Sequence, residues 1–282
     1  MDNTVVQALI MGIVQGLTEF LPISSSGHLV LVPYVMGWTD PFITSLAFSV
    51  MLNVGTLAAL LLYFGRDWLR LVPAGFATIR DRSFRGDPDR KLAWLLVATT
   101  IPAALVGFFL NDVIDKQFHG TGAGTASLVA AMLVVGAGIM WAADRWGGQT
   151  RRVGDVTFPL ALGLGIAQAL ALIPGISRSG VSIAAGRLAG LDRESAARFS
   201  FLMAAPIILG ATLFEIRKFL ADDTAVAVSL GPLIVGTVAS FVAGILAIRI
   251  LLDYLQSHSL TIFVIYRLVL AAVILALVWL GH

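Results

Sequence analysis

The fold of this chain is decided by two related stretches, IVQGLTEFLPISSSG at residues 13–27 and IAQALALIPGISRSG at residues 166–180. At an offset of 153 residues, seven of their fifteen positions are identical, including a glutamine and the Ser-x-Ser-Gly ending. The first copy has Glu19 and Ser25 where the second has Leu172 and Arg178. Two halves that share a scaffold but divide its polar groups indicate one composite site between them.

The composition is that of a membrane protein. Of the 282 residues, 58% are hydrophobic and 13% are charged, with a mean hydropathy of +0.90, and a soluble domain has about twice that charged fraction. The chain has no cysteine, which excludes disulfides and thiol chemistry. Its short basic loops offer no face for nucleic acid. Six segments are long enough, or nearly so, to span a bilayer as helices: 41–64, 92–110, 120–143, 199–214 with a modest extension, 224–248 and 259–281.

The charged loops predict the orientation of the first half. Residues 65–91 and 144–152 are rich in arginine, which places both loops on the cytoplasmic side. Residues 111–119 between them are predicted to form an external loop that contains His119. The loops of the second half carry nearly balanced charge, so they do not set an orientation.

The motif segments predict broken helix pairs. Residues 4–21 and 23–37 are apolar but separated at Pro22, and residues 156–173 and 176–190 are separated at Pro174-Gly175. We expect each pair to be re-entrant, with its tip inside the membrane, where irregular backbone must line a cavity or pack within protein. Broken apolar segments at matching positions of two halves point to a central site. A true span at 156–173 is the alternative.

The topology follows from parity. We expect residues 1–150 and 151–282 to be two repeats of one membrane domain, 1–282, each with one re-entrant pair and three spans. An odd number of crossings turns the second repeat upside down, so the two tips meet. The predicted fold is therefore an all-α integral membrane protein, an inverted-topology repeat with six transmembrane helices and two re-entrant pairs.

The first tip combines a helix break with hydroxyl groups. Pro22 ends the first helix, and Ser24, Ser25 and Ser26 then lie at the start of the next. The free N–H groups and the helix dipole favour an anion there, and Gly27 permits its close approach.

His28 and Glu19 add proton-transfer groups to this tip. His28 lies three residues after Ser25 on the same helical face, a spacing that can place an imidazole beside a hydroxyl, as nucleophilic catalysis requires. A structural histidine is the alternative. Gln15 and Glu19 are four residues apart on one face of the preceding helix, and a carboxylate at this depth is by default functional.

The second tip supplies a cation. Arg178 lies between Ser177 and Ser179 and before Gly180. A guanidinium flanked by hydroxyls suits phosphate oxygens, which it can bind bidentately. Together the two tips offer a nucleophile, a base, a carboxylate and an anion clamp, a set that fits phosphoryl transfer.

Several of these residues also have structural interpretations. Ser24 and Ser26 are equally suited to cap the helix, and Arg178 could extend to the membrane interface. Arg267, inside the last predicted span, fits a structural ion pair as well as a substrate contact. Asn53 is expected to form an interhelical hydrogen bond.

The motifs resemble those of a known family. Residues 15–28 resemble the (Glu/Gln)-x-x-x-Glu and Ser-Ser-(Thr/Ser)-Gly-His segments of bacterial undecaprenyl-pyrophosphate phosphatases, the bacitracin-resistance family. Residues 174–182 resemble that family's Pro-Gly-x-Ser-Arg-Ser-x-x-Thr motif. Length, hydropathy and motif spacing match too, so the resemblance covers essentially the whole chain.

The resemblance implies a reaction and a place. Undecaprenyl pyrophosphate would be hydrolysed to undecaprenyl phosphate and inorganic phosphate, which recycles the lipid carrier for peptidoglycan and gives bacitracin resistance. It implies a divalent cation, Mg or Ca, and a multi-pass protein of the bacterial inner membrane whose site opens to the extracytoplasmic side. Its partners would be the lipid substrate and membrane lipid, with a homodimer left open.

The resemblance also implies residue roles. Ser25 would be the nucleophile and His28 its base or acid. Glu19, with Gln15, would hold the metal or position the pyrophosphate, and Arg178 would bind phosphate oxygens. The substrate would also be lined by Ser24, Ser26, Gly27, Ser177, Ser179, Gly180 and Ser182.

Departures from the family pattern are mild. Gln15 stands where many members have Glu, which removes a charged metal ligand, and Ser26 and Ser182 stand where Thr is usual. Direct attack by water is an alternative to a Ser25 intermediate. The main alternative function is a transporter or flippase for a phosphorylated lipid, because opposed re-entrant hairpins are also transporter architecture.

Overall fold

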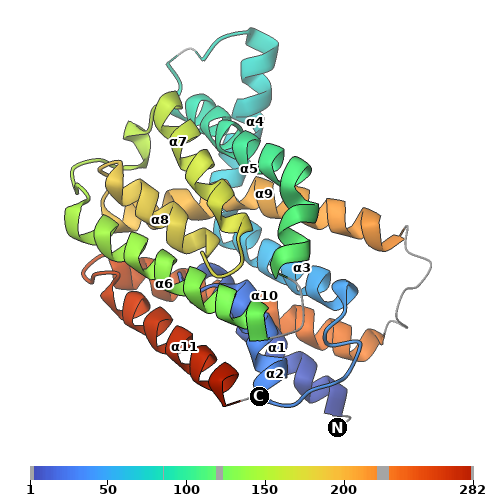
Figure 1. The fold of residues 1–282 in the computed structure, drawn as a ribbon. Helices are drawn as coiled ribbons and strands as arrows, with labels where there is room; N and C mark the ends of the chain where they lie inside the picture. The colour runs from blue at the N-terminus through green and yellow to red at the C-terminus, as the bar shows by residue number, and fades with distance from the viewer. Residues whose placement is uncertain (1–2, 85, 119–122, 221–228, 281–282) are drawn as a thin grey trace.

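The structure is a computed structural model that describes residues 3–84, 86–118, 123–220 and 229–280, and its regular elements are helices (Figure 1). The first half contains α1 (Asn3–Phe20), α2 (Ser25–Val35), α3 (Leu46–Tyr63), α4 (Gly65–Asp81), α5 (Pro88–Phe118) and α6 (Ala123–Trp146). The second contains the short 3-10 helices η1 (Val153–Asp155) and η2 (Leu170–Leu172) with α7 (Phe158–Ala169), α8 (Arg178–Leu188), α9 (Arg193–Leu220), α10 (Leu230–Leu255) and α11 (Thr261–Trp279).

The described residues include five helices that are long and apolar enough to cross a membrane. These are Pro88–Leu110, Gly124–Trp146, Arg193–Arg217, Leu230–Leu255 and Thr261–Trp279. The pair Ala47–Tyr63 and Gly65–Asp81, bent by 85°, brings the number to six if it counts as one span. The expectation of an all-helical, multi-pass membrane protein is confirmed.

Two predicted loops are in fact helical. Residues 65–91, predicted as a loop from their charge, contain α4, and residues 111–118 continue α5. In α4 the charges are spaced so that an apolar stripe remains, with Asp67 in the first turn and Arg80 in the last, where each complements the helix dipole. The described residues do not include His119 of the predicted external loop. They also do not include residues 120–122 and 224–228, which lie at the edges of two predicted spans.

Both predicted helix breaks are present. α1 ends at Phe20 and α2 begins at Ser25. In the second half, α7 continues into η2, which ends at Leu172, and α8 begins at Arg178. The residues that enter the second helices, Ser24 and Ser177, both have positive φ, 76° and 73°. We call residues 19–28 and 173–182, which include these breaks and the starts of α2 and α8, the first and second tips.

Glycines let the first helix of each pair approach a helix of the other half closely. A Cβ at Gly12 of α1 would lie 2.2 Å from the Gly236 oxygen on α10, and one at Gly165 of α7 would lie 2.5 Å from the Thr99 oxygen on α5. Such distances exclude any side chain, so α1 is packed against α10 and α7 against α5.

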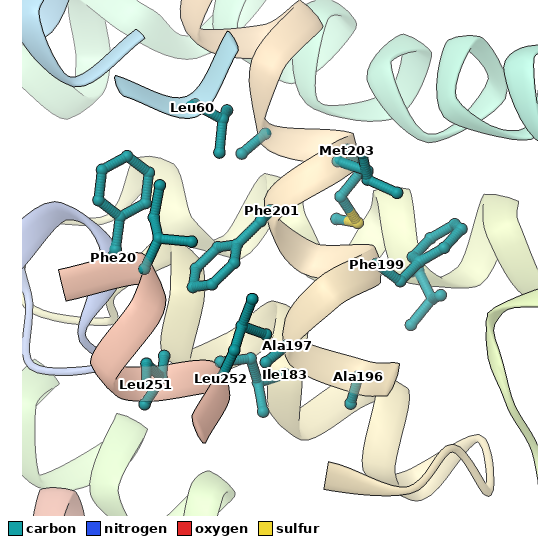
Figure 2. Packing of buried hydrophobic residues seen from close by; sticks show 14 of the residues in the cluster. Phe20, Leu60, Ile183, Ala196, Ala197, Phe199, Phe201, Met203, Leu251 and Leu252 are labelled. Atoms are coloured by element: carbon teal, nitrogen blue, oxygen red, sulfur yellow. The ribbon is translucent and has the colours of Figure 1, made fainter. Parts of the chain in front are cut away.

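A hydrophobic core anchors the first tip. Phe20, fully buried at the end of α1, packs edge-on against Phe201 of α9 with ring centroids 5.5 Å apart (Figure 2). Leu251 and Leu252 of α10 lie in the same cluster. Two helices, α9 and α10, thus fix the position at which α1 ends, one residue after Glu19.

Candidate active site

The two tips contact each other. Arg178 donates from Nη2 to Oε1 of Glu19 at 3.0 Å, although the residues are 159 positions apart. Ser179 donates to the carbonyl oxygen of Leu21 at 3.1 Å. The polar groups that the two sequence copies divide between them are therefore brought into one place.

Glu19 is the centre of this site. Its Oε2 accepts hydrogen bonds from Ser25 Oγ at 2.7 Å and from Gln15 Nε2 at 3.2 Å, while its Oε1 accepts from Arg178. The side chains of Glu19 and Arg178 are only 12% and 15% exposed, so their attraction is weakly screened by water. The contact with Ser25 places a carboxylate where it can take the hydroxyl proton.

His28 does not pair with Ser25, so that expected contact is wrong. Its Nδ1 lies 2.7 Å from the Ser24 carbonyl oxygen and its Nε2 lies 2.6 Å from the Tyr266 hydroxyl. A carbonyl can only accept, so Nδ1 carries a proton and Nε2 of the neutral ring accepts from Tyr266. Ser25 is the first residue of α2, and its side chain turns back to Glu19 rather than along α2.

The serines of the two tips have matching geometry but different contacts. Ser24 Oγ lies 3.3 Å from Ser26 Oγ, and Ser177 Oγ lies 3.3 Å from Ser179 Oγ. Ser177 also accepts from the Gly180 amide at 3.2 Å and so caps α8, whereas the Ser24 side chain makes no capping hydrogen bond. The cap interpretation, which was made for Ser24 and Ser26, is therefore wrong for Ser24, and the cap lies instead at Ser177 of the second tip.

Several polar atoms at the site lack a partner within the described residues. They are Nη1 of Arg178, Oε1 of Gln15 and Oγ of Ser182, all buried. A buried donor or acceptor without a partner is costly. These atoms can therefore bind two kinds of ligand. The guanidinium and hydroxyl groups can donate hydrogen bonds to an anion, and the amide oxygen beside Glu19 can coordinate a cation.

The two glycines of the tips differ in how closely they are packed. A Cβ at Gly27 would meet Ser24 Oγ at 3.6 Å, an ordinary van der Waals contact, so the packing there does not demand glycine. A Cβ at Gly180 would lie 2.9 Å from Arg267 Nη1, so this glycine makes room for a guanidinium.

Three contributors to the site were not predicted as site residues. Asn53 makes its expected interhelical hydrogen bond, in which its Oδ1 accepts from Gln15 Nε2 at 2.8 Å. Tyr266 had no sequence signal, because its contact with His28 spans 238 positions. Arg267 has no ion-pair partner in the described part of the chain: its guanidinium donates to backbone carbonyls, including that of Ile176 at 2.9 Å.

The residues fit a cation that is shared with a substrate rather than caged by protein. Among the described residues there is no group of three or more His, Cys, Asp or Glu that could hold a metal. Mg²⁺ is commonly bound by one or two carboxylates together with substrate phosphates and water. The Glu19 carboxylate and the unpartnered Gln15 oxygen offer such an incomplete set.

The fold and the site define a class: helical membrane enzymes that act on phosphate groups. The chain belongs to the family of the bacitracin resistance protein BacA, whose family model matches residues 8–273. It is 44% identical to the undecaprenyl-diphosphatase of Desulforudis audaxviator over 271 residues, 96% of this chain and 97% of that protein. It is 45% identical to that of Thermomicrobium roseum over 275 residues, with the same coverage, and 44% identical to that of Gemmatimonas aurantiaca over 97% of both chains.

Proposed function

We propose that this protein hydrolyses undecaprenyl diphosphate to undecaprenyl phosphate and inorganic phosphate in a bacterial membrane. Full-length similarity to undecaprenyl-diphosphatases supports the substrate and the reaction. The observation that carries the chemistry is the Ser25–Glu19–Arg178 contact, which joins a hydroxyl, a proton acceptor and a phosphate-binding cation. The product returns the lipid carrier to cell-wall synthesis, and bacitracin resistance follows because bacitracin sequesters the substrate.

In the proposed reaction, Ser25 Oγ attacks the terminal phosphorus. The Oγ–P bond forms, the bond to the bridging oxygen breaks, undecaprenyl phosphate leaves, and the Ser25 proton passes to Glu19. Water then hydrolyses the phosphoserine. We assign the base role to Glu19 rather than His28 because of the 2.7 Å contact between Glu19 and Ser25. His28 positions the start of α2 through the Ser24 carbonyl.

Arg178 binds the terminal phosphate without releasing Glu19. Its Nη2 holds Oε1 of Glu19, while Nη1 is buried and lacks a partner within the described residues. Guanidinium donors to phosphate oxygens are among the strong charge-assisted hydrogen bonds. A divalent cation, Mg²⁺ or Ca²⁺, would neutralise diphosphate charge when bound, and Glu19 with Gln15 would hold it.

We infer that residues 1–150 and 151–282 are inverted repeats, with the site open to the extracytoplasmic side. The matching φ angles and Oγ–Oγ distances at the two tips support this arrangement. So does the reciprocal packing, in which α1 contacts α10 and α7 contacts α5. The chain has no cysteine, so single cysteines introduced at the N-terminal ends of α1 and α7 can be labelled from either side of the membrane. Labelling of both α1 and α7 N-termini from the same side would refute the inversion.

Phosphate release from undecaprenyl diphosphate by purified protein in detergent tests the function. We expect release that EDTA suppresses and that Ser25→Ala and Arg178→Ala abolish. Full turnover by Ser25→Ala would rule out the phosphoserine and favour direct attack by water. No release from a folded wild type that still binds the lipid would favour a transporter or flippase.

A further inference from the structure

Two adjacent residues of α11 contact opposite tips of the site. The Tyr266 hydroxyl lies 2.6 Å from His28 Nε2, which belongs to the first half. Arg267 donates from Nη2 to the carbonyl oxygens of Gly175 and Ile176 at 2.5 and 2.9 Å, at the second tip. Neighbouring residues on an α-helix point about 100° apart, which lets one helix reach both tips.

Arg267 occupies a place built to hold its guanidinium. It is fully buried, and a Cβ at Gly136 of α6 would lie 2.1 Å from its Nη2. Its partners in the described part of the chain are carbonyl oxygens, including Leu133 O at 3.3 Å, and the Met140 sulfur at 3.5 Å. A buried cation without a carboxylate partner among the described residues is an expensive way to gain stability. What the planar guanidinium provides is geometry: Nη2 donates to two successive carbonyls of the second tip while Nε donates to Leu133 of α6, so the second tip is fixed relative to α6.

Those two carbonyls lie in the strained part of the second tip. Gly175 has φ of 96° and Ser177 has φ of 73°, directly before Arg178. A non-glycine residue in such a conformation persists only where its surroundings hold it. Arg267 supplies that hold one residue before Ser177.

The first tip is held in the same way. Ser24, at φ of 76°, offers its carbonyl to His28 Nδ1, and His28 is held in turn by Tyr266. The rings of His28 and Tyr266 are also stacked, with an interplanar angle of 13°. Each strained serine is therefore held from α11 through a neighbour: Ser177 through the preceding carbonyl of Ile176, and Ser24 through His28.

We propose that Tyr266 and Arg267 form a clamp that sets the position of Ser25 and Glu19 relative to Arg178. They are positioning residues, since neither contacts the reacting groups. The kinetic effects expected of the clamp rest on the proposed phosphatase function, whereas its expected effect on the contact between the two tips does not. A clamp that acts through both tips should govern the contact between them.

The kinetic test compares conservative variants with matched controls. Arg267→Lys keeps the charge but loses the fork, and we expect its kcat to fall about 100-fold, the effect of a misplacement of about 1 Å. Tyr266→Phe removes one hydrogen bond, and we expect a fall of about tenfold. KM should change little in both. The controls Arg249→Lys and Tyr34→Phe make the same changes at residues whose exposed fractions are 74% and 49%, and they should leave kcat unchanged.

Non-additivity separates positioning from a general loss of structure. In an Arg178→Lys background, Arg267→Lys should cause little further loss, because it acts through Arg178. A further loss as large as in the wild-type background would overturn the clamp.

A measurement without turnover tests the clamp independently of the function. Leu21→Cys and Ser179→Cys introduce the only thiols, at positions where the two tips touch. We expect the disulfide to form several-fold more slowly when Arg267→Lys is added and at the parent rate when Arg249→Lys is added. Equal rates in all three proteins would refute the clamp, even if the wild type proved not to hydrolyse the lipid.

Discussion

Replacing Glu19 with glutamine tests the centre of the site. The amide keeps the shape of the side chain but removes its charge and one of its two acceptor oxygens. Ser25 then loses the carboxylate, 2.7 Å away, that can take its proton, and Arg178 loses its counter-charge at 3.0 Å. Removal of a general base costs about 10²–10⁴ in rate, so we expect kcat to fall by at least about 100-fold.

The same change should also destabilise the fold. Breaking a buried ion pair from one side costs about 3–5 kcal/mol. The pair is 12% and 15% exposed, so screening reduces the expected loss to about 2–3 kcal/mol. The assay is phosphate release at saturating lipid, with the thermal unfolding midpoint measured on the same samples. Glu194→Gln, at an exposed glutamate of α9, is the control and should change neither quantity. A Glu19→Gln kcat within tenfold of wild type would refute the assignment of Glu19 as base.

Three further predictions concern packing, strain and the cation. Gly12→Val should lower the thermal midpoint strongly, because its Cβ would meet the Gly236 oxygen at 2.2 Å; overpacking typically costs about 1–3 kcal/mol, and an unchanged midpoint would contradict the close approach of α1 and α10. Ser24→Gly should raise the free energy of unfolding by about 1 kcal/mol, and with it the thermal midpoint, since glycine adopts positive φ without strain. A loss of stability would show that the contacts of the Ser24 side chain contribute more than the relief of backbone strain. EDTA should suppress phosphate release and added Mg²⁺ should restore it, whereas full activity in EDTA would remove the cation from the proposal.

The helix breaks and the pairing of their tips could be predicted from the sequence because they are local and repeated. Pro22 and Pro174 disfavour continuation of a helix because proline has no backbone N–H to donate. The repeat suggests that the two helix breaks lie side by side. Glu19 and Arg178 were identified because charge within apolar sequence demands a partner.

The partners of individual side chains could not be predicted in the same way. Ser25 and His28 have helical spacing, but spacing does not fix which way the first residue of a helix points. The contacts of His28 and Arg267 depend on where α11 packs, and α11 is apolar apart from Thr261, Tyr266 and Arg267, so its sequence does not show which helices Tyr266 and Arg267 face. α4 was not predicted because residues 65–91 were interpreted from their number of charged residues, and not from the helical spacing of those charges.

The exposed stripe of α4 has a consequence for the depth of the reaction in the bilayer. Leu69, Val72 and Phe76 are 78%, 51% and 66% exposed, and α4 projects from one end of the helix assembly (Figure 1). Such a face suits a helix that lies along a membrane surface, and α4 is joined to α3 at a bend of 85°. α3 carries Asn53, which accepts a hydrogen bond from Gln15. We therefore expect the position of α4 in the membrane to set the depth of Gln15 and Glu19, and with it the depth at which the proposed site meets a diphosphate headgroup.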